Sequence, residues 1–145
     1  MDASRAEVEE AAVRLLARRE HSFTELTRKL DRRGWPAELV ERVLSDLAER
    51  GLQSDQRYAE SFARSRAAKA YGPMRIRAEL AERGVDRALI DQTVRALEVD
   101  WFACAANWYE RKYGNEAVQD FKEKSRRQQA LARRGFAHEH IRELI

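Results

Sequence analysis

Apolar residues recur along the chain at the three- and four-residue spacing of amphipathic α-helices. The pattern predicts a helix wherever such a face repeats, and it predicts no β-strand. The first 50 residues contain three such faces, made by Val8, Ala12, Leu15 and Leu16, by Phe23, Leu26 and Leu30, and by Val40, Val43, Leu44 and Leu47.

Gly34 and Pro36 separate the second face from the third. Gly34 suits the residue just past a helix end, where a positive φ is needed. Pro36 suits the first turn of the next helix, where its missing N–H leaves no hydrogen bond unmade. The first 50 residues therefore predict a three-helix unit.

The same pattern returns 50 residues later. Leu26 aligns with Ile76, Leu30 with Leu80 and Gly34 with Gly84. A third copy follows at an offset of 51, where Leu131 and Gly135 repeat Leu80 and Gly84, and its extra residues fall near 114–122. Repeats of this length are typical of arrays of supersecondary units. We expect an all-α protein of three tandem three-helix repeats in an elongated, curved chain, with repeats at 5–53, 54–99 and 100–145.

Composition agrees with a packed helical protein. Charged residues make up 37% of the chain and hydrophobic residues 43%, with a net charge of +3. The single cysteine, Cys104, forms no intrachain disulfide, which fits a reducing compartment. Because the sequence has no signal-like or membrane-spanning apolar run, we expect a cytoplasmic protein with no membrane contact. We also expect it to be a monomer.

The segment YGPMRIRAEL, residues 71–80, carries the sharpest local signal. Gly72 and Pro73 suit the start of a helix, and a helix boundary is the simplest interpretation. The charges around it add a second interpretation, because residues 61–77 contain no acid. An acid-free run of this kind can follow phosphates or meet an acidic partner. Its cations are Arg64, Arg66, Lys69, Arg75 and Arg77.

A second basic run spans residues 122–134. Residues 37–60 and 79–100 each carry six acids and three bases, so charge alternates with position in the repeat. Each block could be an ordinary solvated helix face, but two basic blocks together predict a basic stripe. The candidates for contact with a partner in the second run are Lys124, Arg126, Arg127, Arg133 and Arg134.

The residues give little support for catalysis. His21, His138 and His140 lie at no metal-ligand spacing, and Cys104 falls in a helical pattern that fills a core. The chain has no glycine-rich phosphate loop. Most of the late aromatic residues are expected in the core. We therefore expect no enzymatic activity, no cofactor and no metal.

Three segments resemble the RecX family of bacterial recombination regulators. They are LLARREHSFTELTRKLDRRG, LSDLAERGLQSDQRYAESFARSRAAKAYGPMRIRAELAERGV and the terminal LARRGF. The resemblance covers about residues 11–141. The glutamate and leucine of the family's Tyr-Gly-Pro motif fall on Glu79 and Leu80, and its Asp-x-Arg-Tyr segment falls on Asp55, Arg57 and Tyr58. The third unit looks clipped at its C-terminus.

The resemblance implies a non-enzymatic regulator of DNA recombination, DNA repair and the SOS response. Such a protein binds the RecA recombinase on DNA and inhibits its strand exchange, ATPase and co-protease activities. It also implies three tandem three-helix repeats, and it leaves open whether single- or double-stranded DNA is contacted directly.

The alternative is a stand-alone DNA-binding regulator whose units act like helix-turn-helix motifs. The third helices oppose this alternative, because Glu38, Glu41 and Asp46 in the first unit and Asp86 and Asp91 in the second are acidic. A helix that enters a groove lined by phosphates is usually basic.

Overall fold

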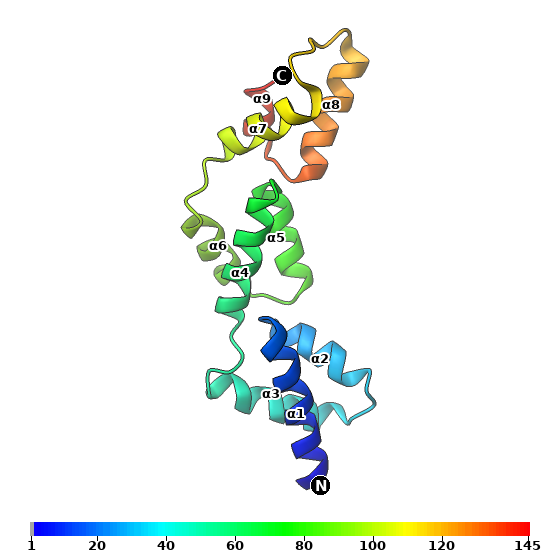
Figure 1. The fold of residues 1–145 in the computed structure, drawn as a ribbon, viewed down its shortest axis with the longest axis vertical. Helices are drawn as coiled ribbons and strands as arrows, with labels where there is room; N and C mark the ends of the chain where they lie inside the picture. Colours follow the sequence, from blue (N-terminus) through cyan, green and yellow to red (C-terminus); the bar gives the residue numbers. More distant parts are fainter. Residues whose placement is uncertain (1) are drawn as a thin grey trace. The chain divides into compact units, whose positions relative to one another are not determined.

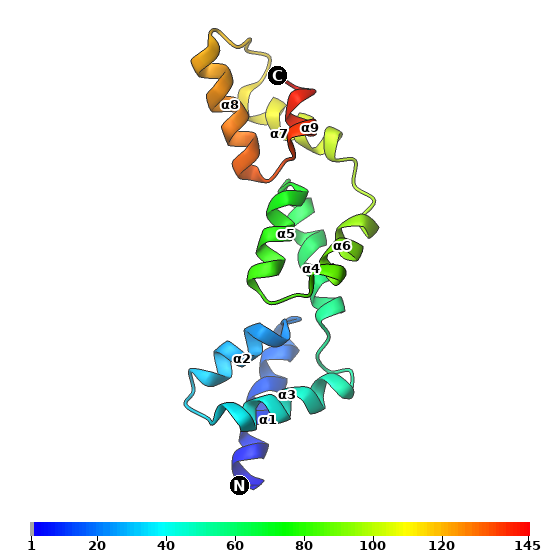
Figure 2. The same ribbon diagram turned by 180° about the vertical axis from the view of Figure 1, so that it is seen from behind.

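The structure, a computed structural model, describes residues 2–145, with side chains from Ser4 onward. This range forms α-helices joined by turns and contains no β-strand (Figures 1 and 2). No helix within it is long and apolar enough to cross a membrane. The prediction of an all-α chain of three-helix units is confirmed.

The first domain consists of α1 (Asp2–Arg18), α2 (Phe23–Asp31) and α3 (Ala37–Glu49). The three apolar faces read from the sequence meet in one core, whose fully buried members include Leu26, Leu30 and Leu44. The capping residue Ser22 fixes the start of α2, because its hydroxyl accepts a hydrogen bond from the Glu25 N–H while the Glu25 carboxylate accepts from the Ser22 N–H. Pro36 lies one position before α3 rather than in its first turn.

The second domain consists of α4 (Asp55–Ala68), α5 (Pro73–Glu82) and α6 (Arg87–Ala96). Its buried residues repeat those of the first domain at an offset of 50, with Ile76 at the position of Leu26 and Leu80 at that of Leu30. Pro73 is the first residue of α5, where its fixed φ and missing N–H are tolerated.

The third domain consists of α7 (Trp101–Tyr113), α8 (Phe121–Arg134) and α9 (His138–Arg142). Its core contains Ala105, Leu131, Phe136 and Ile141. The extra residues of this repeat form the connection between α7 and α8 and lengthen α8 to 14 residues, against 10 in α5. The last helix ends at Arg142, three residues before the end of the third repeat as read from the sequence.

The late aromatic residues divide between core and surface. Phe136 is buried, and Trp101, Trp108 and Tyr109 pack against the third core. Phe102 and Phe121 are exposed, the latter by 84%. The expectation of a core position holds for Phe136 and for the three rings that pack against the third core. It does not hold for Phe121, which is the first residue of α8 and precedes the apolar face of that helix.

The residues group into two compact units by contact. One holds the chain up to Ser61 together with Leu80–Ile90, and the other holds Phe62–Glu79 together with Asp91–Ile145. The first unit contains a contact between the first and second domains, and the second unit contains one between the second and third domains.

Candidate functional site

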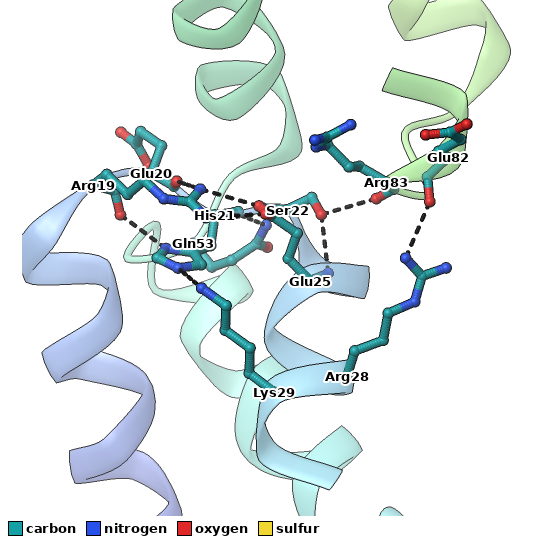
Figure 3. A network of polar contacts seen from close by, with 10 residues as sticks. All are labelled: Arg19, Glu20, His21, Ser22, Glu25, Arg28, Lys29, Gln53, Glu82 and Arg83. Atoms are coloured by element: carbon teal, nitrogen blue, oxygen red, sulfur yellow. Dashed lines mark hydrogen bonds and ion pairs between the residues drawn. The ribbon is translucent and has the colours of Figure 1, made fainter. Parts of the chain in front are cut away.

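In the first unit the start of α2 meets the end of α5 (Figure 3). The Ser22 hydroxyl donates a hydrogen bond of 2.8 Å to the main-chain oxygen of Arg83. Arg28 donates to the main-chain oxygen of Glu82 at 3.1 Å. Helix ends leave carbonyl oxygens without intrahelical partners, so Ser22 at the start of α2 and Arg28 in its last turn supply donors that the end of α5 lacks.

Gly84 allows this close approach. A Cβ at Gly84 would lie 2.0 Å from the Thr24 hydroxyl oxygen, and its φ of +77° is the left-handed conformation that glycine adopts without strain. Glycine is thus required at this position for two independent reasons, the backbone conformation and the space beside Thr24.

Beneath Ser22, the buried imidazole of His21 joins the turn to α2. Its Nδ1 lies 3.0 Å from the main-chain oxygen of Arg19, and its Nε2 lies 2.9 Å from the Lys29 Nζ. In the arrangement that satisfies both contacts, Nδ1 donates and Nε2 accepts from the ammonium. Burial lowers the pKa of His21, and the Arg19 and Lys29 cations lower it further. The pKa of Lys29 is also lowered, first by burial and then by Arg19.

We therefore expect acid to weaken the first unit through His21. The unfolded imidazole titrates near its usual pKa of about 6.5, whereas the folded one titrates lower. The stabilising contribution is complete above about pH 6.5 and is lost as the pH falls towards the folded pKa, with a slope of at most about 1.4 kcal/mol per pH unit. Urea unfolding between pH 7.5 and 5 measures it. In His21→Gln this part of the pH dependence disappears, and an unchanged slope in that variant contradicts the assignment.

In the second unit the same contact recurs between the start of α5 and the end of α8. The main-chain N–H of Gly72 donates to the Arg134 oxygen, and that of Met74 donates to the Gly135 oxygen, both at 2.9 Å. A Cβ at Gly72 would lie 2.3 Å from the carbonyl carbon of Gly135, so the two backbones touch. We call the contact of Gly84 with the start of α2 the first glycine-turn junction, and the contact of Gly135 with the start of α5 the second glycine-turn junction.

Tyr71 lies beside the second glycine-turn junction and contacts three guanidinium groups. Those of Arg134, Arg66 and Arg75 lie 3.9, 4.0 and 4.5 Å from its ring centroid. Such stacking attracts a cation to the electron-rich ring face. Arg66 and Arg75 of the basic segment around YGPMRIRAEL therefore pack on the tyrosine that precedes the start of α5.

Several predicted partner-facing cations have partners inside the protein. Arg66 forms a two-pronged pair with Glu79 at 2.8 and 2.5 Å, which raises its pKa, and Arg75 lies 3.6 Å from the same carboxylate. Arg77 pairs with Asp91. Arg134 donates to the main-chain oxygens of Ala70 and Lys69. These side chains first of all hold helices and the junction together.

Arg127 is buried, with 3% of its surface exposed, so it does not belong to the surface set. It occupies the position of the core residues Leu26 and Ile76 in the other repeats. Its guanidinium donates to the Tyr109 hydroxyl, to the Glu116 oxygen and to Glu123, and it lies 4.5 Å from the Tyr113 ring centroid. The Tyr109 contact raises its pKa.

The remaining predicted cations are exposed and have no ion-pair partner among residues 4–145. Lys69 and Arg133 border the second glycine-turn junction, because the main-chain oxygen of Lys69 accepts from Arg134 and that of Arg133 accepts from Arg75. We call the exposed set the free cations; it consists of Arg64, Lys69, Lys124, Arg126 and Arg133.

The other candidate chemistry is structural in this fold. Burial raises the pKa of the Cys104 thiol, which packs against the third core. The His140 ring stacks edge-on against Phe102 at 4.7 Å between centroids. Among the described residues no group of histidine, cysteine and carboxylate side chains could hold a metal ion.

The exposed face of α3 is acidic. Glu38, Glu41, Asp46 and Glu49 line a surface hollow there, together with Arg42 and Ser45. A helix that reads DNA would bring this face against phosphates, which it repels. The acidic face therefore argues against the helix-turn-helix alternative for the first domain.

Ser22, Arg28 and Gly84 take part in a contact between domains that was not predicted from the sequence. A signal for this contact was present, because a glycine turn recurs in each repeat and Ser22 with Glu25 forms a capping-box pattern. The sequence did not indicate that the turn of one repeat packs on the helix start of the preceding one.

Taken together, these features define an all-helical protein of three tandem domains, connected by glycine-turn junctions and carrying exposed cations near the second junction. Three family models match the chain, described as the first, second and third three-helix domains of RecX, over residues 4–47, 54–94 and 98–145. The chain belongs to the RecX family.

Similar proteins carry the name Regulatory protein RecX. The one from Pseudomonas entomophila (strain L48) is 49% identical over 138 residues, which cover 95% of this chain and 89% of the relative. The one from Halorhodospira halophila (strain DSM 244 / SL1) is 47% identical over 135 residues, covering 93% of this chain and 84% of the relative.

Solved structures share the fold. The crystal structure of RecX from Lactobacillus salivarius superposes with a TM-score of 0.81 at 19% identity, covering 99% of this chain and 95% of that one. A second, titled crystal structure of regulatory protein RecX, has a TM-score of 0.78 at 24% identity and covers 94% of this chain and 68% of that one.

Proposed function

We propose that this protein binds the RecA recombinase filament and inhibits its recombination, ATPase and co-protease activities without catalysing a reaction itself. The observation that carries the proposal is the match of all three domains to the RecX family, whose curated members are named regulatory proteins. A regulator of this kind acts by binding one conformation of its target better than another, so it needs a binding surface and no catalytic group.

The free cations beside the second glycine-turn junction are the proposed contact surface. Lys69 and Arg133 lie close to Tyr71, and Arg64 lies on α4. Because their charges are not neutralised within the described chain, they remain available to an acidic surface of the recombinase or to DNA phosphates. Complementary charge of this type raises association rates and selects the partner.

Arg66 and Arg75 support this surface from within. Both pair with Glu79 and both stack on Tyr71, so they hold the ring and the junction in place. Reversing their charge would disturb the fold beside the surface, and a test of binding must leave them unchanged. A sharper test replaces only free cations.

We expect the triple variant Arg64→Glu, Lys69→Glu, Arg133→Glu to need roughly 100-fold more protein to inhibit the DNA-dependent ATPase of RecA filaments. The measurement is steady-state ATP hydrolysis on single-stranded DNA with increasing amounts of the variant, after circular dichroism has shown unchanged helicity. The matched control is Arg18→Glu, Arg42→Glu, Arg87→Glu, which changes the same number of exposed charges elsewhere. Equal inhibition by the two triple variants contradicts the proposed surface.

A separate measurement distinguishes the DNA-binding alternative. We expect weak binding to naked duplex DNA without sequence preference, decreasing steeply with salt. Tight, sequence-selective binding to a duplex in the absence of RecA would instead favour the stand-alone regulator.

A further inference from the structure

The glycine turn occurs three times in the chain, and two of the three are occupied. Gly84 and Gly135 each lie against the start of a helix in the preceding domain, where an added Cβ would lie 2.0 Å from Thr24 and 2.4 Å from Arg75. At the equivalent Gly34 an added Cβ would meet nothing within 4 Å, although its φ of +89° is positive like those of the other two glycines. Among the described residues, the turn of the first domain is thus the one of the three that no helix start covers.

Within the described part of the chain, the carbonyl oxygens of the Gly34 turn are free to accept the hydrogen bonds that the equivalent oxygens accept in the glycine-turn junctions. The oxygens of Glu82 and Arg83 accept hydrogen bonds from Arg28 and Ser22 in the first unit. The equivalent oxygens of Arg32 and Arg33 accept none from residues 4–145. The side chains around them are exposed, and Arg33 stacks 4.7 Å over the Trp35 ring.

The complementary half lies in the third domain. In the second unit the N-cap residue Gly72 and the second helical residue Met74 supply the N–H donors. Their counterparts on α8 are Asp120 and Lys122, whose N–H groups have no partner among the described residues. Between them lies Phe121, the most exposed large apolar side chain of the described range at 84%.

The two halves carry opposite charge. The turn of the first domain carries Arg32 and Arg33, whereas the start of α8 carries Asp120 and, before it, the exposed Glu116. In the second junction Arg134 donates to main-chain oxygens just before the receiving helix. Arg33 holds the same place in its turn and would meet the acidic stretch before α8 there.

We propose that the exposed glycine turn of the first domain, Arg32–Gly34, docks on the start of α8 in a second copy of this chain, repeating between copies the junction that the chain makes twice within itself. The contact is head-to-tail, joining two different surfaces, so each copy in a pair keeps one half of the contact free for a further copy. In this proposal dilute protein is monomeric, and association begins at high local concentration.

Sedimentation velocity of the purified full-length chain tests this inference without any recombinase, so its outcome is independent of the proposed function. We expect the weight-average sedimentation coefficient to rise between about 10 µM and 1 mM, the range of weak contacts. Arg33→Glu and Phe121→Lys each place like charges opposite one another and keep the Asp120 cap, so each variant alone stays monomeric. Mixed in equal amounts, they restore association, because the unchanged α8 start of the Arg33→Glu variant receives the unchanged turn of the Phe121→Lys variant.

Arg18→Glu is the matched control, since it makes the same charge change at an exposed site outside the turn and leaves the concentration dependence intact. Recovery in the mixture is the decisive result, because no effect on the fold of either variant can produce it. The inference is overturned by a wild-type coefficient that does not change with concentration, or by a mixture that behaves as two monomers.

Discussion

Replacing Gly135 by alanine is expected to lower the free energy of unfolding by about 2–5 kcal/mol. Part of the loss comes from the left-handed backbone at φ +104°, which costs a residue with a Cβ about 1–2 kcal/mol. The rest comes from overlap with the Arg75 Cβ at 2.4 Å and its main-chain nitrogen at 2.8 Å, since overpacking typically costs about 1–3 kcal/mol. Urea unfolding followed by circular dichroism measures the sum.

Gly34→Ala separates the two contributions. It sits at the same position of its repeat, also with positive φ, but nothing lies within 4 Å of the added Cβ. We expect only the backbone contribution, about 1–2 kcal/mol. Gly72→Ala gives the opposite separation, because its φ is not positive and its Cβ meets backbone atoms of Gly135. If Gly135→Ala and Gly34→Ala were equally destabilising, the close contact of the second junction would be wrong.

Truncating Arg127 to alanine is expected to lower the melting temperature of the third domain by roughly 10 °C. The change removes the donor for the Tyr109 hydroxyl, the Glu116 oxygen and the Glu123 carboxylate at once. It also leaves a void in the core. Removal of one member of a buried polar network is among the most destabilising single changes.

The neighbouring Arg126→Ala is the control, because Arg126 is exposed and has no ion-pair partner among residues 4–145. We expect it to shift the melting temperature by no more than about 2 °C. Arg127→Met should fall between the two, since it fills the volume that Leu26 and Ile76 fill in the other domains but removes the donor to the Tyr109 hydroxyl and to the Glu123 Oε1. Calorimetry of the three variants gives the order, and an Arg127→Ala trace like that of Arg126→Ala contradicts the assigned role.

Local signals explain why the fold could be predicted from the sequence. The repeat at offset 50 fixes which apolar residues are equivalent, and the glycines with positive φ end the second helix of each domain as expected at Gly34, Gly84 and Gly135. Helix ends depend on weaker preferences, which is why α9 stops at Arg142 and Pro36 precedes α3. The residues next to Arg142 and Pro36 are compatible with a helix boundary one or a few positions away.

The site was less accessible to sequence reasoning, because a basic residue looks alike whether it is free or paired. Arg66 and Arg77 lie in the same acid-free run as Arg64, yet their partners Glu79 and Asp91 come from 13 and 14 residues further along the chain. Arg127 stands at a core position of the repeat, but an arginine there reads as a surface residue. Only the packing of the helices shows which charges remain available.

The glycine-turn junctions also bring helix ends of opposite partial charge together. At each one the carbonyl end of a helix, which carries a partial negative charge, meets the N–H end of another, which carries a partial positive charge. α8 meets α5 in this way in one unit, and α5 meets α2 in the other. The partial charges oppose each other at both meetings. Two ends of these three helices meet no other helix end among the described residues: the start of α8, flanked by Asp120 and Glu123, and the end of α2, flanked by Arg28 and Lys29. At each of these ends the side chains have the sign that neutralises the macrodipole.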